Sequence, residues 1–387
     1  MSTYDFENLP NRINTGSIKW DRYADRDILP MWVADMDFRA APEVEAALQE
    51  RVSHGVFGYT NPTAEAVQAI CRYMSEVHGC HIEETWILWT PGIVPALNIA
   101  ARAFCNQGQG VITTVPIYPP FLTAPRYQER KLLSVALHNS AGFYTFDWDA
   151  LERNITAETR VFFLCNPHNP VGRVWSRDEL TQVVQFCDRH QLILVSDEIH
   201  CDLILSADHE HCTALKIDDW VKKNGVTLMA PSKTYNLCGL ACSFVIISDD
   251  ALRRSFRRSM RGLFNELNCL GYAACAAAYQ HGESWRRELL QVLRRNYAEI
   301  VQFTEETMPL IKVSPLQATY LAWLDIRALK LHHPRTHFER RGVGLNDGTE
   351  FGVPGFVRLN FGCPPSRLRE ALRRMKIAYD DAVRGDK

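Results

Sequence analysis

The stretch LILVSDEIHCDL, residues 192–203, decides the prediction of the fold. Its first four residues form an unbroken apolar run bounded by polar residues, which is typical of a strand covered on both faces. Asp197 should then lie where this buried strand ends. An acid in that place can cap the following helix, but a buried carboxylate also needs a partner. The stretch therefore predicts a central strand of an α/β sheet with an acid at its carboxyl end.

Similar apolar runs recur along the chain and alternate with helical patterns. They lie at 86–89, 111–115, 161–165, 226–230 and 244–247. Apolar residues between 93 and 104 follow helical spacing, and Ser176 with Glu179 predicts a capping box that opens another helix. This alternation of strands and helices predicts a mainly parallel α/β sheet.

The pattern changes after Gly282. One long amphipathic helix is expected at about 285–308, followed by short strands at 320–325 and 356–360 and a last helix from Ser366. We therefore expect an N-terminal segment (1–45) that joins the small domain and the entrance of the active site. A large domain (46–282) and a smaller α+β C-terminal domain (283–387) follow, with the cleft between them as the default site.

Composition excludes several classes of protein. The 387 residues include 43 basic and 45 acidic side chains, so no global charge attracts nucleic acid or an anionic membrane. The sequence shows neither a targeting segment nor an apolar run near the roughly 20 residues of a membrane span. We expect a cytoplasmic protein whose twelve cysteines are reduced core thiols.

Two histidine clusters and one arginine cluster call for an interpretation. HGCH (78–81) and HEHC (209–212) resemble metal ligands, but neither repeats at zinc-finger spacing, and we interpret both as polar surface loops without a metal. RRSFRRSMR (253–261) places its charges at helical spacing. We interpret it as the solvated face of a helix rather than a nucleic-acid site.

Polar residues that follow the apolar runs should converge, because open α/β sheets bind ligands beyond the carboxyl ends of their strands. They are Gly92, Tyr118, Asn169, Asp197 and Lys233. The loop NPHNPVG, residues 166–172, should fix Asn169 beside the sheet edge. Lys233 stands in an apolar setting, where desolvation would lower its pKa and make it nucleophilic. A structural lysine in a salt bridge is the alternative.

Together these residues describe a site for pyridoxal phosphate. An acid can hold the pyridinium, a lysine can bind the aldehyde, an asparagine can donate to the phenolate, and a glycine before a helix can receive the phosphate. The order and spacing of Asn169, Asp197 and Lys233 resemble those of the fold-type I, aspartate-aminotransferase-like proteins. That resemblance implies a large domain with a mainly parallel, seven-stranded sheet.

A narrower resemblance covers nearly the whole chain. The stretches that carry it are LPMWVADMDF (29–38), HGVFGYT (54–60), NPHNPVGRVW (166–175), SDEIHCDL (196–203), SKTYNLCGL (232–240), TYLAWLD (319–325) and GFVRLNFGCP (355–364). They resemble the MalY/PatB-type cystathionine β-lyases. His200 replaces the tyrosine, and Ala241 the arginine, that many aminotransferases have there. Both departures agree with the lyase subgroup.

The resemblance assigns roles to the cofactor-binding residues. Lys233 would bind the cofactor and then take the Cα proton of the substrate, while Asp197 would keep the ring nitrogen protonated. Tyr118 would stack over the ring and is a candidate for assisting proton transfer; a core aromatic residue is its alternative. The phosphate would rest on the backbone of Gly92, Ile93 and Val94 and on the side chains of Ser232 and Tyr59.

Other residues would meet the substrate or the second subunit. Arg358 resembles the arginine that clamps the α-carboxylate, with an internal salt bridge as the alternative. Trp32 and Tyr320 would line the side-chain pocket, although core packing also suits both. Tyr59 resembles a tyrosine that reaches across a homodimer interface to the neighbouring phosphate; its alternative is a core tyrosine near a turn.

The function expected from this resemblance is a carbon-sulfur β-lyase that converts cystathionine or another cysteine S-conjugate to a thiol, pyruvate and ammonia. An aminotransferase of the same fold is the first alternative, because the mechanistic residues are shared by both. A regulatory protein that keeps the cofactor site is the second, although the presence of Lys233 disfavours it.

Overall fold

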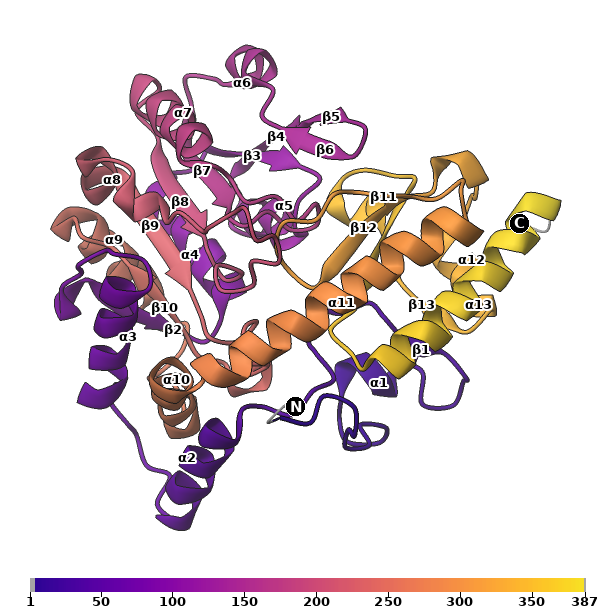
Figure 1. Ribbon diagram of the computed structural model, residues 1–387. Helices are drawn as coiled ribbons and strands as arrows, with labels where there is room; N and C mark the ends of the chain where they lie inside the picture. Colours follow the sequence, from indigo (N-terminus) through magenta and orange to yellow (C-terminus); the bar gives the residue numbers. More distant parts are fainter. Residues whose placement is uncertain (1–3, 386–387) are drawn as a thin grey trace.

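The structure is a computed structural model that describes residues 4–385. Figure 1 shows a larger α/β part and a smaller part built around a second sheet, with the long helix α11 (Glu283–Thr307) running across both. Helix α10 (Cys269–His281) ends immediately before α11 begins. The predicted long helix at about 285–308 is thus confirmed, whereas the domain boundaries themselves stay a prediction.

The larger part is organised by a seven-stranded sheet. Its order is β2 (Ile87–Thr90), β10 (Ser243–Ile246), β9 (Gly225–Met229), β8 (Ile193–Asp197), β7 (Thr159–Cys165), β3 (Gly110–Val115) and β4 (Lys131–Ala136). Strand β10 is antiparallel to both of its neighbours, and the strands from β9 to β4 run parallel to one another. The prediction of a mainly parallel sheet is confirmed, and the opening stretch forms its middle strand.

Helices cover both faces of this sheet, which explains why its strands are apolar without interruption. On β8, Leu194 packs in one core with residues of α3 (Ala64–Glu76), α7 (Arg177–Arg189) and α8 (Asp219–Asn224). Its neighbour Val195 packs in the other core with residues of α4 (Ile93–Phe104), α5 (Pro120–Tyr127) and α9 (Asp250–Met260). The predicted capping box of Ser176 and Glu179 opens α7.

The smaller part has a four-stranded antiparallel sheet in the order β11 (Lys312–Val313), β12 (Leu321–Asp325), β15 (Phe356–Asn360), β14 (Asn346–Asp347). Helices α12 (Pro334–Arg340) and α13 (Pro365–Arg384) accompany it. The remaining elements are α1 (Ile18–Asp21), α2 (Pro42–Ser53), α6 (Trp148–Asn154), the hairpin β5 (His138–Ser140) and β6 (Phe143–Thr145), and the pair β1 (Leu29–Pro30) and β13 (Val343–Gly344).

The N-terminal segment ties the two parts together. Strand β1 pairs in parallel with β13, and Figure 1 shows α1 and β1 beside α13. The side-chain amide of Asn360 donates to the carbonyls of Val33 (2.6 Å) and Asp35 (2.7 Å). From the larger part, the amide of Asn236 donates to the carbonyls of Met36 (3.0 Å) and Phe38 (2.7 Å). Residues 29–38 are thereby held by both parts at once.

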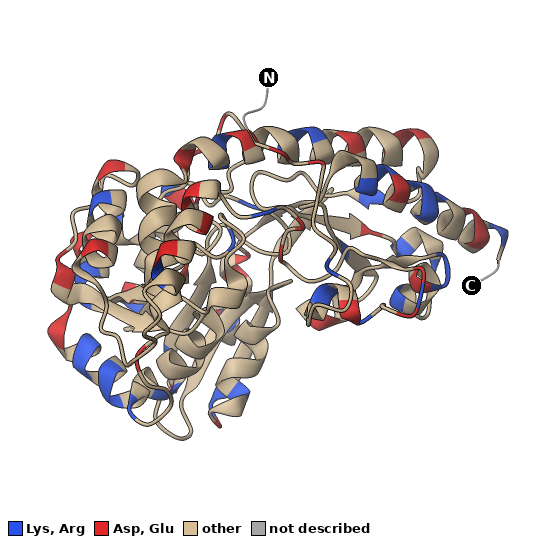
Figure 2. Cartoon of the chain, turned by 90° about the horizontal axis from the view of Figure 1, so that it is seen from below, with Lys and Arg blue, Asp and Glu red and all other residues tan. Residues whose placement is uncertain are grey.

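Charges of both signs are dispersed over the surface. Figure 2 shows basic and acidic residues interspersed along most helices, with basic residues gathered on one of them. In the arginine cluster of α9, Phe256 is buried against Phe104, with ring centroids 6.2 Å apart, while Arg254, Arg257 and Arg258 are exposed. The interpretation of this cluster as a solvated helix face is confirmed. Within residues 4–385, no helix has the length and apolarity that a membrane span requires.

Candidate active site

A cavity of about 240 Å³ lies beyond the carboxyl ends of the central strands. All five polar residues that were expected to converge line it: Gly92, Tyr118, Asn169, Asp197 and Lys233. Ile93, Val94, His200 and Ser232, which the family resemblance added to the set, line the cavity as well, whereas Tyr59 does not. Ala34 brings in the N-terminal segment. Parallel strands place their ends at one edge of the sheet, which is why residues so far apart in sequence meet here.

Asp197 is the last residue of β8 and is buried. Its Oδ1 accepts a hydrogen bond from the backbone of Ile199 at 3.1 Å, and no cation pairs with it among the described residues. Burial is the main cause that raises the pKa of Asp197 to about 7. A buried carboxylate in this state fits a ligand that brings a positive charge, such as the protonated nitrogen of a pyridine ring.

His200 and Asn169 offer further polar atoms to the cavity. The Nδ1 atom of His200 is buried and has no hydrogen-bond partner among residues 4–385. Burial, with smaller contributions from Lys233 and Arg358, lowers the pKa of His200 to about 3, so its ring is neutral. Arg358 donates to Oδ1 of Asn169 at 3.0 Å and so fixes the orientation of the Asn169 amide. These atoms fit the phenolic oxygen of a pyridoxal ring.

Lys233 is held by neighbours from two segments of the chain. Its Nζ donates to the carbonyl of Ala34 at 2.6 Å and lies 3.6 Å from Sγ of Cys238. It forms no ion pair with a carboxylate in the described part of the chain, so the alternative of a structural salt bridge is not observed. The expectation of a lowered pKa is wrong: burial lowers the pKa of Lys233, but Cys238, Tyr118 and Asp35 outweigh burial and raise it.

Another group of residues that line the cavity suits an anion. Gly92 precedes α4 with a φ of 144°, and the backbone N–H groups of Ile93 and Val94 in the first turn donate to no described group. Such a helix N-terminus binds phosphate through its free N–H groups and its dipole. Ser232 and Ala241 line the same cavity, and Ala241 supplies no side-chain donor. One chain thus offers few charged groups to a phosphate.

Arg358 lies in the middle of β15 and is buried. It donates to Oδ1 of Asn169 (3.0 Å), to Oδ1 of Asn346 (2.8 Å) and to the carbonyl of Trp32 (3.1 Å), all of them neutral acceptors. Its Nε is buried without a partner, and burial lowers its pKa to about 10. The alternative of an internal salt bridge is therefore wrong. A guanidinium in this state fits a ligand carboxylate.

The structure separates the remaining predicted residues. Tyr320 is buried; its hydroxyl donates to the carbonyl of Ala34 at 3.0 Å, and its ring lies 6.2 Å from that of His200. Trp32 is half-buried and meets Arg358 through its backbone carbonyl, while its indole donates to the carbonyl of Lys19 at 3.2 Å. Neither side chain is among those that line the cavity. Their assignment to the substrate pocket stays a prediction.

Tyr118 and Tyr59 differ in their surroundings. Tyr118 is half-buried and faces the cavity, as a ring-stacking residue would. Tyr59 is 92% exposed and does not line the cavity of its own chain, so the alternative of a core tyrosine is wrong. Sequence reasoning missed Cys238, an exposed thiol in this cavity, and the carbonyl of Ala34, which accepts from both Lys233 and Tyr320. A sequence pattern does not predict which backbone carbonyl will accept a side-chain hydrogen bond.

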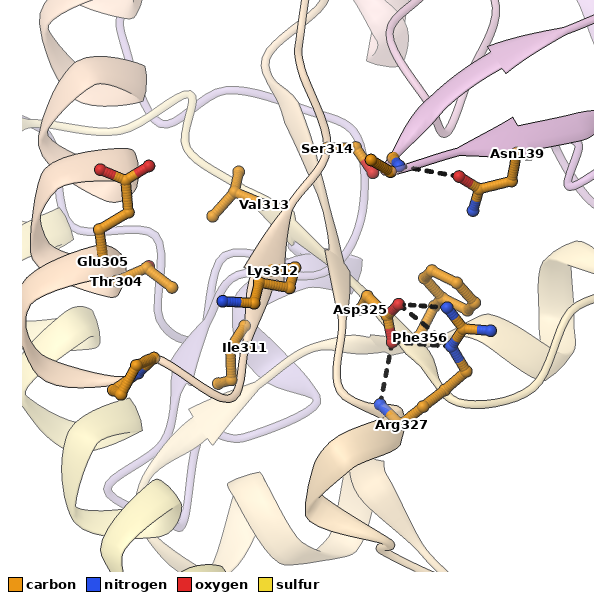
Figure 3. A pocket seen from close by; sticks show the side chains of 13 residues that line it. Asn139, Thr304, Glu305, Ile311, Lys312, Val313, Ser314, Asp325, Arg327 and Phe356 are labelled. Carbon is orange, nitrogen blue, oxygen red and sulfur yellow. Dashed lines mark hydrogen bonds and ion pairs between the residues drawn. The ribbon is translucent and has the colours of Figure 1, made fainter.

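A larger cavity, of about 530 Å³, lies between the β5–β6 hairpin and the smaller sheet. Figure 3 shows Asp325 and Arg327 in the wall of this cavity, where they form an ion pair with a shortest contact of 2.6 Å. Thr304, Glu305 and Lys312 lie on the other side. This cavity contains none of the residues that converge at the sheet edge, and it offers no counterpart to Asp197.

The histidine clusters are loops that are only partly exposed: His81 and Glu210 face solvent, but one histidine of each cluster does not. His78 is buried, and the side chain of His211 is 3% exposed because its Nε2 bonds to the buried carboxylate of Glu198 at 2.9 Å. His78 and His211 pack against each other with ring centroids 5.4 Å apart. The earlier interpretation treated the two motifs separately and therefore missed that the fold brings them together.

Comparison with known proteins decides the family. Residues 26–375 match the family described as "Aminotransferase class I and II". The chain belongs to this family.

Its relatives include "Cystathionine beta-lyase PatB" of Bacillus subtilis (strain 168), 38% identical over 97% of this chain and 99% of that protein. "Protein MalY" of Escherichia coli (strain K12) is 32% identical over 95% of this chain and 97% of its own length. The crystal structure of cystalysin from Treponema denticola, which contains a pyridoxal 5'-phosphate cofactor, matches with a TM-score of 0.94 and 36% identity over 98% and 99% of the two chains.

These matches confirm three predictions. The chain resembles the MalY/PatB-type proteins over nearly its whole length, it has the fold-type I architecture, and it depends on pyridoxal phosphate. The residues present fit that cofactor. Asp197 lacks a cation, His200 has a free ring nitrogen, and α4 presents unpaired N–H groups, all around one cavity.

Proposed function

We propose that the protein is a pyridoxal-phosphate-dependent carbon-sulfur β-lyase that cleaves cystathionine or related S-substituted L-cysteines to a thiol, pyruvate and ammonia. The observation that carries this proposal is the similarity, over nearly the whole chain, to proteins named cystathionine β-lyase. The convergence of Asn169, Asp197 and Lys233 on one cavity supports it.

Two charges of the chain would orient the substrate and the cofactor. Arg358 would bind the α-carboxylate of the substrate. The buried guanidinium, which now has only neutral hydrogen-bond acceptors, would then gain a negatively charged partner. Asp197 would accept a hydrogen bond from the ring nitrogen and keep a proton on it. Tyr118 faces the same cavity and would hold the ring from one side.

The bound cofactor supplies an electron sink for the charge that develops when the substrate loses its Cα proton. Nζ of Lys233 would take that proton, after giving up its own proton and its hydrogen bond to the carbonyl of Ala34. The carbonyl of Ala34 would then remain bonded to Tyr320, so the N-terminal segment stays in place while Lys233 moves.

Expulsion of sulfur from Cβ completes the proposed reaction. A thiol has a pKa of about 8.5, whereas an alcohol is a far weaker acid, so a thiolate leaves more readily than an alkoxide. Proton removal alone does not separate elimination from transamination. The nature of the leaving group and the lyase relatives favour elimination.

The test is product formation from cystathionine, cysteine and an aromatic cysteine S-conjugate, with the serine O-ethers as matched substrates. We expect pyruvate and thiol in equal amounts without any added 2-oxo acid, and much slower turnover of the ethers. An absolute requirement for a 2-oxo acid, with no thiol released, would make the protein an aminotransferase. Bound cofactor without turnover of any substrate would indicate a regulatory protein.

We also propose that the active unit is a homodimer in which Tyr59 binds the phosphate in the neighbouring subunit. Tyr59, Val56 and Phe57 are 92%, 61% and 60% exposed, which is unusual for three apolar side chains so close together. The site also needs a further donor, because Ala241 offers none to the phosphate. A cytoplasmic location, where the twelve thiols stay reduced, remains our expectation.

Mixing two inactive variants tests the shared site. Subunits with Lys233→Ala and subunits with Tyr59→Phe form heterodimers in which one site carries both changes and the other carries neither. Activity should therefore return on mixing if Tyr59 acts across the interface. If Tyr59 acts within its own chain, each site keeps one change and mixing restores nothing. Light scattering of the parent protein gives the oligomeric state independently.

A further inference from the structure

A second polar site lies outside the cofactor cavity. A groove of about 630 Å³ is lined by His78 of the first histidine motif, by His209 and His211 of the second, and by Cys201 and Asp202. Residues from three separate stretches of the chain meet here, and the proposed lyase reaction uses none of them. Imidazole, thiol and carboxylate are the side chains that bind zinc in proteins.

The candidate ligand atoms are already close together. One ligand atom each from His78, Cys201 and Asp202 lie within 4.8 Å of one another, and all three side chains are buried. A tetrahedral ion with metal-ligand distances of about 2.0 to 2.3 Å needs its ligands closer than this, so these side chains would have to move toward one another when the ion binds. Within residues 4–385 no other group of this kind is found.

The hydroxyl of Tyr73 marks the point on which these side chains converge. It lies 2.7 Å from Oδ1 of Asp202, 2.8 Å from Nε2 of His78 and 3.3 Å from Sγ of Cys201. Three side chains of different chemistry thus point at one oxygen. An ion bound beside it would either take the tyrosine oxygen as a neighbour or displace its hydrogen bonds.

His211 supplies the second, independent observation. Its Nδ1 is buried and has no partner among the described residues, while its Nε2 bonds to Glu198. Glu198 is itself fixed by Ser196 (2.8 Å) and by the backbone of Ala214 (2.9 Å). A histidine held by a carboxylate through one nitrogen presents the other nitrogen to a metal, which is the usual arrangement around zinc. This unpaired nitrogen belongs to a ring that packs against His78, but it lies outside the group of three ligand atoms, so His211 would have to move to become a fourth ligand.

We propose that His78, Cys201 and Asp202 bind a thiophilic divalent cation, with zinc as the expected ion and His211 as the fourth ligand. The cation would bind the Cys201 thiolate, and the thiol proton would pass to solvent. Nitrogen and sulfur ligands favour zinc, whereas magnesium and calcium prefer oxygen ligands.

Such an ion would lie directly behind the cofactor cavity. His200 lines that cavity, whereas Cys201 and Asp202 line the groove. Oδ2 of Asp202 also accepts from the hydroxyl of Thr234 at 3.2 Å, next to Lys233. Because a ligand that binds only the folded state stabilises it, zinc should raise the melting temperature of the protein.

The test measures zinc in the purified holoenzyme. The protein is stripped with a chelator, incubated with a small excess of zinc chloride, passed through gel filtration and analysed by mass spectrometry for metal and protein content. We expect one zinc per chain in the parent protein and in Cys71→Ser, a matched control whose half-buried cysteine lies two residues from Tyr73. Cys201→Ser and His78→Gln should each bind zinc at least about tenfold more weakly.

Cobalt identifies the ligand. Addition of cobalt(II) chloride should produce a thiolate-to-metal absorption band in the difference spectrum of the parent protein, and Cys201→Ser should lack the band. If Cys201→Ser does not fold, as judged by circular dichroism, the zinc content of His78→Gln carries the test. Failure of the parent protein to retain zinc, or zinc binding that survives both substitutions, would overturn the proposal. Both results are independent of lyase activity.

Discussion

Replacement of Arg358 by methionine should nearly abolish activity without destabilising the protein. The pKa of this guanidinium falls from 12.5 to about 10 because the side chain is buried, which corresponds to about 3 kcal/mol of unfavourable charge burial. The residue recovers a similar amount through three hydrogen bonds to neutral acceptors, at about 1 kcal/mol each. The two contributions cancel, so we expect the free energy of unfolding of Arg358→Met to change by less than about 1 kcal/mol.

The catalytic activity should fall much more than the stability, because the substrate carboxylate, by binding Arg358, offsets the unfavourable free energy of burying the guanidinium charge. Loss of about 3 kcal/mol of transition-state binding lowers kcat/KM about 100-fold at least. The assay is pyruvate formation from cystathionine, together with urea unfolding of the same preparations. The cofactor absorption should be retained, since Arg358 is not among the residues that line the cofactor cavity.

Arg173→Met is the matched control. Arg173 is also buried, but it forms an ion pair with Glu179 and donates to Gln317 at 2.7 Å. Glu179 is partly exposed, so loss of this pair together with the other hydrogen bonds of Arg173 should destabilise the protein by about 3 kcal/mol, the lower end of the range for buried pairs. If Arg358→Met destabilises the protein as much as Arg173→Met, or if it turns over cystathionine like the parent, then Arg358 is a structural arginine and our reasoning is wrong.

Three further predictions concern the site and its supports. Asp197→Asn should lower kcat about 10- to 100-fold. Burial raises the pKa of Asp197 from 3.8 to about 7, so the charged carboxylate costs the folded parent apoprotein about 4 kcal/mol above pH 7 and almost nothing near pH 4. In urea unfolding, the Asp197→Asn apoprotein should therefore be more stable than the parent at pH 8 and equally stable near pH 4; a difference in stability that does not change with pH would contradict this. Gly172→Ala should cost about 2 to 4 kcal/mol in urea unfolding, since φ is +69° and the added Cβ would lie 2.0 Å from Cδ1 of Leu316; an unchanged midpoint would disprove the clash. Borohydride should fix the cofactor to Lys233 in the parent protein and to no residue in Lys233→Ala, as peptide mapping can check; a label on another lysine would refute the assignment.

The sequence was informative wherever local pattern and sheet geometry act together. The apolar run before Asp197 predicted a strand buried on both faces, and the rule for parallel sheets predicted that Asn169, Asp197 and Lys233 would meet. Both predictions depend only on strand direction and on the order of residues. The resemblance to known lyases then supplied roles that spacing alone left open.

Properties set by tertiary neighbours were out of reach. The raised pKa of Lys233 depends on Cys238, Tyr118 and Asp35, which no sequence pattern places beside it. Burial of His78 and His211 results from a contact between segments far apart in the chain. A histidine-rich motif looks polar in isolation, and only the fold shows which of its members face solvent.

The N-terminal segment of residues 29–38 constrains the order in which the protein can fold during its synthesis. It is synthesised before the central sheet, yet its partners Val343, Gly344 and Asn360 are synthesised after that sheet. The nascent chain can therefore assemble the central sheet during synthesis, whereas residues 29–38 gain their partners in β13 and β15, and Ala34 its fixed place beside Lys233, only after those strands have been made. Ribosome-bound chains that stop short of β15 should accordingly remain catalytically incompetent, even when the seven-stranded sheet is complete.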